Sequence, residues 1–297
     1  MRVFWTIGLV ALLSCGGADS PGPAGAAQPP AAAAPPAVFG NPERVTVQGY
    51  DQDLMEPFVS RDGRYLFFNN RNDPGTDTDL FYAERLDDLT FAFRGPIAGA
   101  NSPALDAVAS MDMAGNFYFV TTRSYPQDQE TLYSGRFQDG TLIGVAPVRG
   151  LSLHQIGSVN FDAEINREGT ALYSVDGVFQ PGSPGPRSAT LILAAPGGPG
   201  FLRQDPAILA PVNGPDPQYA PATSGDGLEL YFTRLVPGQV PAMFRAWRAG
   251  TAEPFGAPER LWAADGFVEA PALSPDERSL YYHKLEGGRF VLYRLTR

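Results

Sequence analysis

The sequence predicts an all-β protein, a five-bladed β-propeller made of four-stranded antiparallel blades. Three observations predict this fold. One aromatic-rich strand recurs five times, a glycine precedes four of its copies, and no stretch keeps a 3.6-residue apolar period free of Gly and Pro. A repeat period of about 50 residues is typical of repeat architectures, and radially packed sheets bury both faces of such strands.

The repeat is most evident in the second strand of each blade. These strands begin at Tyr65, Phe117, Ala171, Glu229 and Ser279, with spacings of 52, 54, 58 and 50 residues. Turn glycines precede the first four strands, at Gly63, Gly115, Gly169 and Gly227, and Glu277 takes this place in the fifth. Six residues before the turn position the chain carries Pro57, Ala109, Ala163, Pro221 and Pro271. We therefore expect a short first strand before each turn.

The remaining strands follow from the same repeat. Third strands are expected over residues 79–84, 130–136, 189–194, 242–248 and 289–295, and outer strands near 96–98, 147–149, 207–211 and 258–262. The chain stops directly after a third strand, so the last blade lacks its outer strand. Residues 40–45 parallel residues 256–261, and we expect them to complete the last blade and pair its open edge.

The motifs of the first repeat resemble those of a known family. Residues 56–63 read Glu-Pro-Phe-Val-Ser-Arg-Asp-Gly, a Phe-Phe-Asn-Asn-Arg segment follows at 67–71, and Asp-Leu-Phe-Tyr follows at 79–82. This pattern resembles the TolB-type, WD-repeat-like propeller repeat, and the resemblance extends over nearly everything after residue 42. It implies a propeller and, as partner, a component of a cell-envelope complex. The repeat is specific for fold and weak for activity.

Composition excludes several classes of protein. The formal net charge is −10, and Lys284 is the only lysine. An acidic chain of this kind is a poor match for nucleic acid, which requires clustered Lys and Arg. One cysteine excludes a disulfide framework, and a chain with only two histidines is a poor candidate for a Cys/His zinc site. We expect no metal and no cofactor.

The first residues predict where in the cell the protein is targeted. Residues 3–13 are an apolar run that is too short for a bilayer of about 30 Å but fits a secretory signal over residues 1–14. The Leu-Leu-Ser-Cys end of this run resembles the bacterial lipobox, which implies lipidation of Cys15. The alternative is an ordinary signal peptide with a chance cysteine.

The predicted domain organisation follows from this resemblance. Residues 15–40 form a Pro/Ala-rich tether, expected to be disordered, and residues 41–297 form the propeller. Gly16 after the cysteine is compatible with the outer membrane. We therefore expect a monomer in the bacterial cell envelope, held by its lipid alone at the periplasmic face of the outer membrane.

Acidic residues gather in the loops that lead from one blade to the next. Candidate binding residues at this channel mouth are Asp53, Glu56, Asp106, Asp162, Asp216 and Glu269. They would suit a cation, a basic peptide segment or a sugar. The alternative is that each acid bonds the backbone of its own turn. Arg71, Arg123, Arg234 and Lys284 follow the second strands, and we expect each to pair within its own blade.

Two functions from different classes remain open. The first is a non-catalytic module whose face binds an envelope protein or peptide, with a basic partner segment favoured by charge. The second is a glycan-binding or glycan-cleaving propeller whose carboxylates act as acid and base. Acids that recur at related repeat positions argue against catalysis. Convergence of two carboxylates beside aromatic rings would favour the glycan function, and isolated turn-bonded acids the binding module. An acidic run at Asp73, Asp77 and Asp79 is interpreted as a polar hairpin loop rather than a calcium site.

Overall fold

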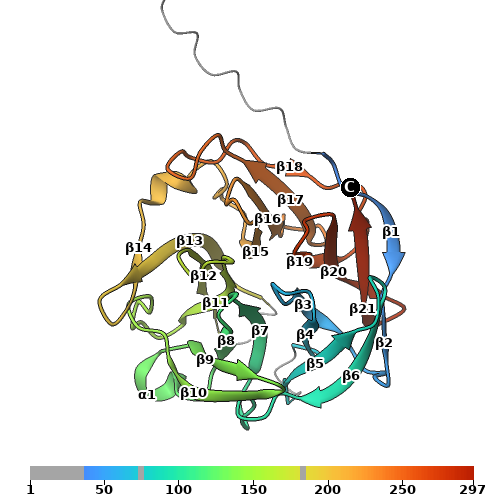
Figure 1. Cartoon of the computed structure of the whole chain (residues 1–297). Helices are drawn as coiled ribbons and strands as arrows, with labels where there is room; N and C mark the ends of the chain where they lie inside the picture. Colours follow the sequence, from blue (N-terminus) through green and yellow to red (C-terminus); the bar gives the residue numbers. More distant parts are fainter. Residues whose placement is uncertain (1–36, 73–76, 181–184) are drawn as a thin grey trace, which may run out of the picture. The chain divides into compact units, whose positions relative to one another are not determined.

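The computed structural model describes residues 37–72, 77–180 and 185–297, and five antiparallel blades surround one centre in this part of the chain (Figure 1). The predicted five-bladed propeller is confirmed. Inner to outer, blade 1 holds β3 (Met55–Val59), β4 (Tyr65–Asn69), β5 (Leu80–Arg85) and β6 (Thr90–Pro96). Blade 2 holds β7 (Asp106–Met111), β8 (Asn116–Thr121), β9 (Leu132–Gln138) and β10 (Thr141–Pro147). Blade 3 holds β11 (Ser158–Ile165), β12 (Leu172–Val178), β13 (Ser188–Gly197) and β14 (Gly200–Arg203).

Blades 4 and 5 complete the ring. Blade 4 holds β15 (Gln218–Thr223), β16 (Glu229–Arg234), β17 (Ala242–Trp247) and β18 (Glu259–Arg260). Blade 5 holds β19 (Val268–Leu273), β20 (Ser279–Glu286) and β21 (Arg289–Thr296), and its outermost strand is β1 (Gly40–Arg44). The N-terminal strand therefore completes the last blade, as the sequence predicted.

The first hairpin of each blade explains the Ser-x-Asp part of the repeat. The Ser60 hydroxyl donates to Asp62 at 2.6 Å and accepts the Tyr65 N–H at 2.8 Å. Equivalent bonds form at Ser224 and Ser274. The motif is therefore a turn device in which side chains satisfy backbone donors, not a binding signature.

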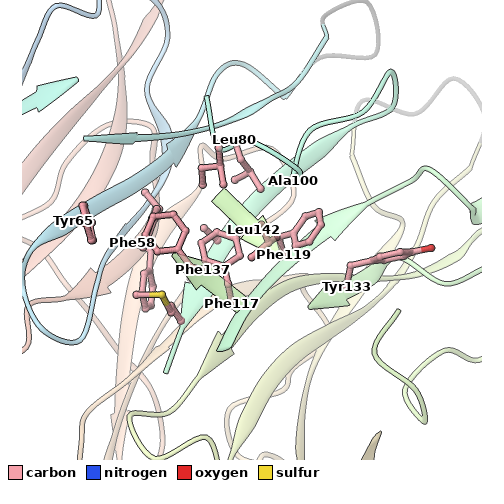
Figure 2. Packing of buried hydrophobic residues seen from close by; sticks show 13 residues of the cluster. Phe58, Tyr65, Leu80, Ala100, Phe117, Phe119, Tyr133, Phe137 and Leu142 are labelled. Carbon is pink, nitrogen blue, oxygen red and sulfur yellow. The ribbon is translucent and has the colours of Figure 1, made fainter. Parts of the chain in front are cut away.

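Each interface between neighbouring blades is a hydrophobic core of its own. Between blades 1 and 2, Phe67 of β4 lies edge-on to Phe117 of β8 with ring centroids 5.1 Å apart, and Phe137 lies 4.9 Å from Phe67 (Figure 2). Four similar clusters fill the other interfaces. Because second-strand side chains from both faces enter such cores, these strands read as apolar runs.

Every inner strand carries a β-bulge at the equivalent position of the repeat. The bulged residues are Glu56, Val108, Asp162, Ala220 and Ala270, with φ between 49° and 60°. A non-glycine residue with positive φ is uncommon, and this conformation costs of order 1–3 kcal/mol. The next residue is the repeated proline or alanine, and these residues line the central channel. A proline there leaves no unpaired N–H in the channel wall.

The bulges connect the blades through hydrogen bonds. The N–H of Glu56 donates to His283 at 3.1 Å, that of Val108 to Asn69 at 3.1 Å, and that of Ala270 to Thr233 at 3.1 Å. Each acceptor ends the second strand of the preceding blade, so the ring is joined around its channel.

Ring closure rests on two segments that follow each other in sequence. β1 pairs antiparallel with β21 of blade 5, and β2 (Thr46–Gln48) then pairs parallel with β6 of blade 1. Val45 and Val47 are buried between these blades. The sequence did not predict β2, because three residues give no strand pattern.

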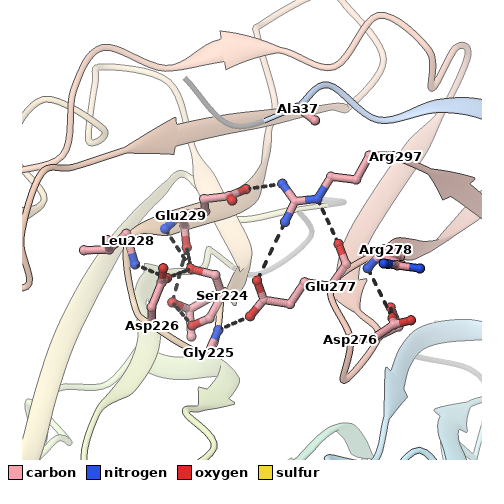
Figure 3. A network of polar contacts seen from close by, with 12 residues as sticks. Ala37, Ser224, Gly225, Asp226, Leu228, Glu229, Asp276, Glu277, Arg278 and Arg297 are labelled. Carbon is pink, nitrogen blue, oxygen red and sulfur yellow. Dashed lines mark hydrogen bonds and ion pairs between the residues drawn. The ribbon is translucent and has the colours of Figure 1, made fainter. Parts of the chain in front are cut away.

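Arg297 holds the closing blade from the other end of the chain. Its guanidinium lies 2.6 Å from Glu229 of blade 4 and donates to the Glu277 carbonyl at 2.8 Å (Figure 3). It also lies 4.7 Å from the ring centroid of buried Phe39. One side chain thus links the last blade, the preceding blade and the N-terminal segment.

The expected outer strand of blade 4 contains β18, whereas those of blades 1 and 2 were placed too late and that of blade 3 was missed. Pro96 and Pro147 end β6 and β10 rather than begin them, because proline removes a ladder donor. In blade 3 the expected 207–211 overlaps a 3-10 helix, Pro206–Ile208, capped by Asp205. A short helix, α1 (Tyr125–Asp128), was also not predicted. Over the described ranges, neither helix is long and apolar enough to cross a bilayer.

Replacing Arg297 tests the closure. Arg297→Ala breaks an ion pair whose side chains are only 11% and 14% exposed, so we expect a loss of about 3 kcal/mol in unfolding free energy. Arg44→Ala, in the exposed pair with Glu286, is the control and is expected to cost about 0–1 kcal/mol. Equal losses in urea denaturation would contradict the role given to Arg297.

Candidate functional site

The channel mouth is the face on which the outer strand of one blade leads to the inner strand of the next. All six predicted acids lie at or near this mouth face, but at different steps relative to the bulge. Glu56 and Asp162 are the bulged residues, Glu269 precedes a bulge by one residue and Asp106 by two. The expectation that these acids recur at equivalent positions holds for Glu56 and Asp162 and is wrong for the other four. Each bulged residue directly precedes the repeated proline or alanine, so counting back from the turn position would have shown this register.

Two of the acids are neutralised by arginine, and a third lies beside one. Asp53 lies 2.8 Å from Arg71, and Asp106 lies 2.7 Å from Arg123. Burial would raise the pKa of Asp53, but hydrogen bonds from Arg71 and from a backbone N–H bring it below its ordinary value. Asp216 is the charged neighbour of Arg234.

Each of the four basic residues pairs within its own blade, as predicted, and Arg71 in addition donates to the Gly288 carbonyl of blade 5 at 2.8 Å. Besides the two ion pairs of Arg71 and Arg123, Arg234 donates to the Val212 carbonyl at 2.9 Å and Lys284 lies 2.7 Å from Asp265. These cations therefore stabilise the loops of their own blades.

The other three acids form a separate group, which we call the channel acids: Glu56, Asp162 and Glu269. They come from blades 1, 3 and 5. Burial, followed by the charges of Asp162 and Glu269, raises the pKa of Glu56 well above its ordinary value. Burial also raises the pKa of Asp162 to about 7, with Glu269 adding to the rise. Mutual repulsion shows that the channel acids share one electrostatic environment.

Asp162 has a structural role besides its charge. Its carboxylate accepts the N–H of Ala220, the bulged residue of blade 4, at 2.6 Å. In blades 1, 2 and 5 this N–H bonds a side chain from the preceding second strand, but blade 3 has Val175 at the equivalent place, and valine has no acceptor. Asp162 thus takes over the inter-blade bond.

Glu269 is held by two groups that the sequence did not single out as site residues. The Tyr219 hydroxyl donates to one of its oxygens, and His283 Nε2 lies 3.0 Å from the other. Because His283 Nδ1 accepts the Glu56 N–H, Nε2 carries the proton and donates to Glu269. His283 is fully buried. No motif signals such a histidine, because its partners Glu56 and Glu269 come from two blades.

Glu56 and Asp162 are less fully bonded. Glu56 accepts from Asn72 at 3.4 Å through one oxygen, and Asp162 uses one oxygen for Ala220. Within the described residues, the second oxygen of each carboxylate accepts no hydrogen bond, and neither residue contacts a cation. These two groups therefore have unused binding capacity in the channel.

The channel beside these acids is narrow. It encloses a cavity of about 30 Å³, lined by Glu56, Asp162 and the repeated prolines and alanines. A cavity of this size is large enough to hold a water molecule. Deeper in the channel, Glu164 is saturated by Arg61 at 2.7 Å and Ser110 at 3.1 Å. The free space suits one small polar group next to Glu56 and Asp162.

Metal binding finds no support in this region. Across the described residues, no three His, Cys, Asp or Glu side chains come close enough to share an ion. Asp73 lies outside the described residues, as do Cys15, the predicted signal peptide and most of the predicted tether.

Solved structures share this fold at low sequence identity. The chain is similar to Zg3597, a family 117 glycoside hydrolase of Zobellia galactanivorans, with TM-score 0.56, 13% identity, and coverage of 87% of this chain and 90% of that one. It is similar to the catalytic domain of Coprinopsis cinerea GH62 α-L-arabinofuranosidase, with TM-score 0.53, 12% identity and coverage of 87% and 96%. The likeness is one of fold.

A TolB protein is also among the similar structures. TolB from Acinetobacter baumannii matches with TM-score 0.48 and 14% identity over 83% of this chain. The chain spans about half of the TolB protein, 55% of its length, and the likeness is too distant to carry an argument about function. No protein-family model and no curated protein matches the sequence.

The raised pKa values of Asp162 and Glu56 predict a pH dependence of stability. Between the ordinary carboxyl pKa and about 7 the folded protein binds more protons than the unfolded chain, so stability falls as pH rises through this window. We expect Tm to fall by several degrees from pH 5 to pH 8, since each kcal/mol moves Tm by about 2–4 °C at this size.

Two variants test the assignment. Asp162→Asn keeps an oxygen for the Ala220 N–H but does not titrate, so its Tm should change less with pH. Asp53→Asn is the matched control: the pKa of Asp53 is lowered, so its loss should destabilise the protein at neutral pH. An unchanged profile in Asp162→Asn would refute the assignment.

Proposed function

We propose that this chain is a non-catalytic lipoprotein of the bacterial cell envelope whose mouth face binds a positively charged segment of a protein partner. The observation that carries the proposal is the pair of incompletely bonded carboxylates, Glu56 and Asp162, beside a cavity of about 30 Å³. Ionised carboxylates that are buried without a cation are unfavourable, and a cationic group of the partner relieves this cost. The resemblance of the repeat to TolB-type propellers is consistent with a partner in an envelope complex.

A second candidate function is glycan cleavage. Carboxylates from three blades converge, and Tyr219 and Phe161 lie next to them, which is the arrangement expected of a glycan site. Glycosidases also divide the acid and base roles between a carboxyl group with a raised pKa and a neighbouring ionised carboxylate. The cavity size favours the binding module, because a space of about 30 Å³ does not hold a sugar ring between the acids. Turnover of p-nitrophenyl furanosides that disappears in Glu56→Gln would establish the enzyme instead.

Neutralising the channel acids tests the binding function. We expect Glu56→Gln combined with Glu269→Gln to reduce at least tenfold the protein partner crosslinked to the full-length chain in its own envelope. Capture by the native protein should be stronger at pH 8 than at pH 6, because the ionised carboxylates bind the cation.

The control removes two other negative charges from exposed loops of the mouth face, with Asp51→Asn and Asp265→Asn. Both variants should keep the native circular dichroism spectrum. If the two double variants lose partner equally, or neither loses any, the channel acids are not the binding site.

The predicted lipid anchor is tested at Cys15. We expect the mature protein to begin at this cysteine with the mass of added acyl chains and to sediment with membranes. Cys15→Ser should move the protein into the soluble periplasmic fraction. A mature N-terminus without lipid, or sedimentation of the variant with membranes, would overturn the anchor.

A further inference from the structure

A second cavity lies on the face opposite the mouth, between blades 1 and 2. Its volume of about 360 Å³ is in the range of small-molecule binding sites. Its walls come from the hairpin turns β3–β4, β7–β8 and β9–β10, which all lie on this face. It shares no lining residue with the cavity beside the channel acids, so the two are separate sites.

Arg61 brings a buried cation with unused hydrogen-bond donors to this cavity. Its side chain is only 8% exposed. Nη2 donates to the Glu164 carboxylate at 2.7 Å and to the Ile165 carbonyl at 2.6 Å, whereas Nε and Nη1 donate to no atom of the described residues. Donors left without a partner on a buried charged group are costly. An added acceptor in the cavity would therefore be stabilised by Arg61.

Asp112 brings a buried carboxylate to the same cavity. It takes the turn position that Ser60, Ser224 and Ser274 hold in three other blades, and it is 3% exposed. Its two oxygens accept the backbone N–H of Asn116 at 2.9 Å and the side-chain amide of Asn116 at 2.7 Å. No cation pairs with Asp112 within the described ranges. A charged group thus stands where the turn needs only an acceptor.

Arg61 and Asp112 line one cavity without forming an ion pair with each other. The charge of Arg61 is instead met by Glu164. A group that accepts from Arg61 and donates to Asp112 is complementary to both. A hydroxyl group does both, whereas an anion only accepts and an ammonium only donates. Asp112 and Glu164 would in addition repel an anion, so the pair favours a neutral ligand that carries hydroxyl groups.

Two further carboxylates stand at the opening of the cavity. One oxygen of Asp62 accepts from the Ser60 hydroxyl at 2.6 Å and from the Arg64 N–H at 3.0 Å, and one oxygen of Asp139 accepts from the Tyr65 hydroxyl at 3.1 Å. Both acids are exposed, and the second oxygen of each accepts no hydrogen bond in the part of the chain that the structure describes. Several acceptors around one opening suit a ligand with several hydroxyl groups.

Apolar side chains form the remaining wall. Met111 and Phe137 are buried, and Met113 is 47% exposed. Phe137 belongs to the core between blades 1 and 2 and is labelled in Figure 2, so its position is fixed by packing. Apolar walls with a few placed polar groups are typical of small-molecule sites. The C–H face of a sugar ring can pack against this wall while its hydroxyl groups reach the polar side chains.

We propose that this cavity binds a sugar residue of a glycan. One hydroxyl group bridges Arg61 and Asp112, and others donate to Asp62 and Asp139. The volume of about 360 Å³ has room for a sugar ring, unlike the cavity of about 30 Å³ in the channel. The inference is independent of the function proposed for the mouth face and involves no cleavage.

Saturation-transfer NMR of the full-length protein with free sugars tests the site. The probes are glucose, galactose, mannose, N-acetylglucosamine, arabinose and xylose, and we expect saturation transfer to at least one of them. Arg61→Lys should weaken the binding of that sugar about tenfold, because lysine keeps a positive charge for Glu164 but lacks the Nε and Nη1 donors. Circular dichroism should show that this variant keeps its fold.

Asp62→Asn provides a second variant with a matched control. The amide keeps one oxygen for the turn but replaces the free carboxylate oxygen, so sugar binding should weaken several-fold. Asp226 makes the equivalent turn bonds in blade 4, with the Ser224 hydroxyl at 2.6 Å and the Leu228 N–H at 2.9 Å, and lines neither cavity. Asp226→Asn should leave sugar binding unchanged.

The remaining outcomes separate this site from the mouth face. Glu56→Gln combined with Glu269→Gln should keep sugar binding, and a loss of binding there would place the sugar in the channel and overturn the inference. Saturation transfer to none of the six sugars, or equal binding by Asp62→Asn and Asp226→Asn, would overturn it as well. Partner capture at the mouth face is measured independently, so either proposal can fail while the other stands.

Discussion

The bulge in the inner strand of every blade is the feature on which the ring and its channel depend. It turns one backbone N–H out of the strand ladder, and in four blades the structure shows that N–H reaching an acceptor of the preceding blade. Each bulge holds a non-glycine residue at positive φ, which is unfavourable by itself. The inter-blade hydrogen bond and the packing of the inner strands offset that cost, so the strained backbone persists only in the closed ring.

The position of an acid relative to the bulge also determines whether an arginine neutralises it. Asp53 and Asp106 lie outside the bulge, where an arginine after the second strand of their own blade reaches them. At the bulge, Glu56 and Asp162 are contacted by no such cation among the described residues. Replacing a buried, unpaired charged residue by an uncharged one often raises the stability of a protein. An acid at such a position is therefore expected to be retained for binding rather than for stability. This difference separates the acids that an arginine neutralises from those that no cation contacts among the described residues.

The sequence was sufficient to predict the blades but not the contacts between residues of the channel. Repeated aromatic strands and the likeness of residues 40–45 to 256–261 led to five blades and to their closure, because these features arise from local pattern. Pairing of Arg71 and Arg123 within their blades also follows from the repeat. Strand β2 and the contacts of His283 could not be predicted from the repeat, because they depend on how blades 5 and 1 meet when the ring closes. The shared position of Glu56 and Asp162 could be read from the repeat, since each directly precedes the aligned proline or alanine, but the bulge at that position has no residue signature.

Repetition itself explains why the distinctive residues gather at the channel. A turn such as Ser60–Asp62 and a core residue such as Phe67 must recur, because every blade packs against the next in the same way. The side chains of the bulged residues differ in their contacts: Val108 packs on the core between blades 2 and 3, Asp162 bonds the next blade, and the Glu56 carboxylate accepts only from Asn72 of its own blade. A residue that departs from the repeat at the bulged position without bonding the next blade is therefore one that the fold does not require. Acids at two of its five copies, with Glu269 beside a third, concentrate carboxyl groups in one small region of an otherwise repetitive ring.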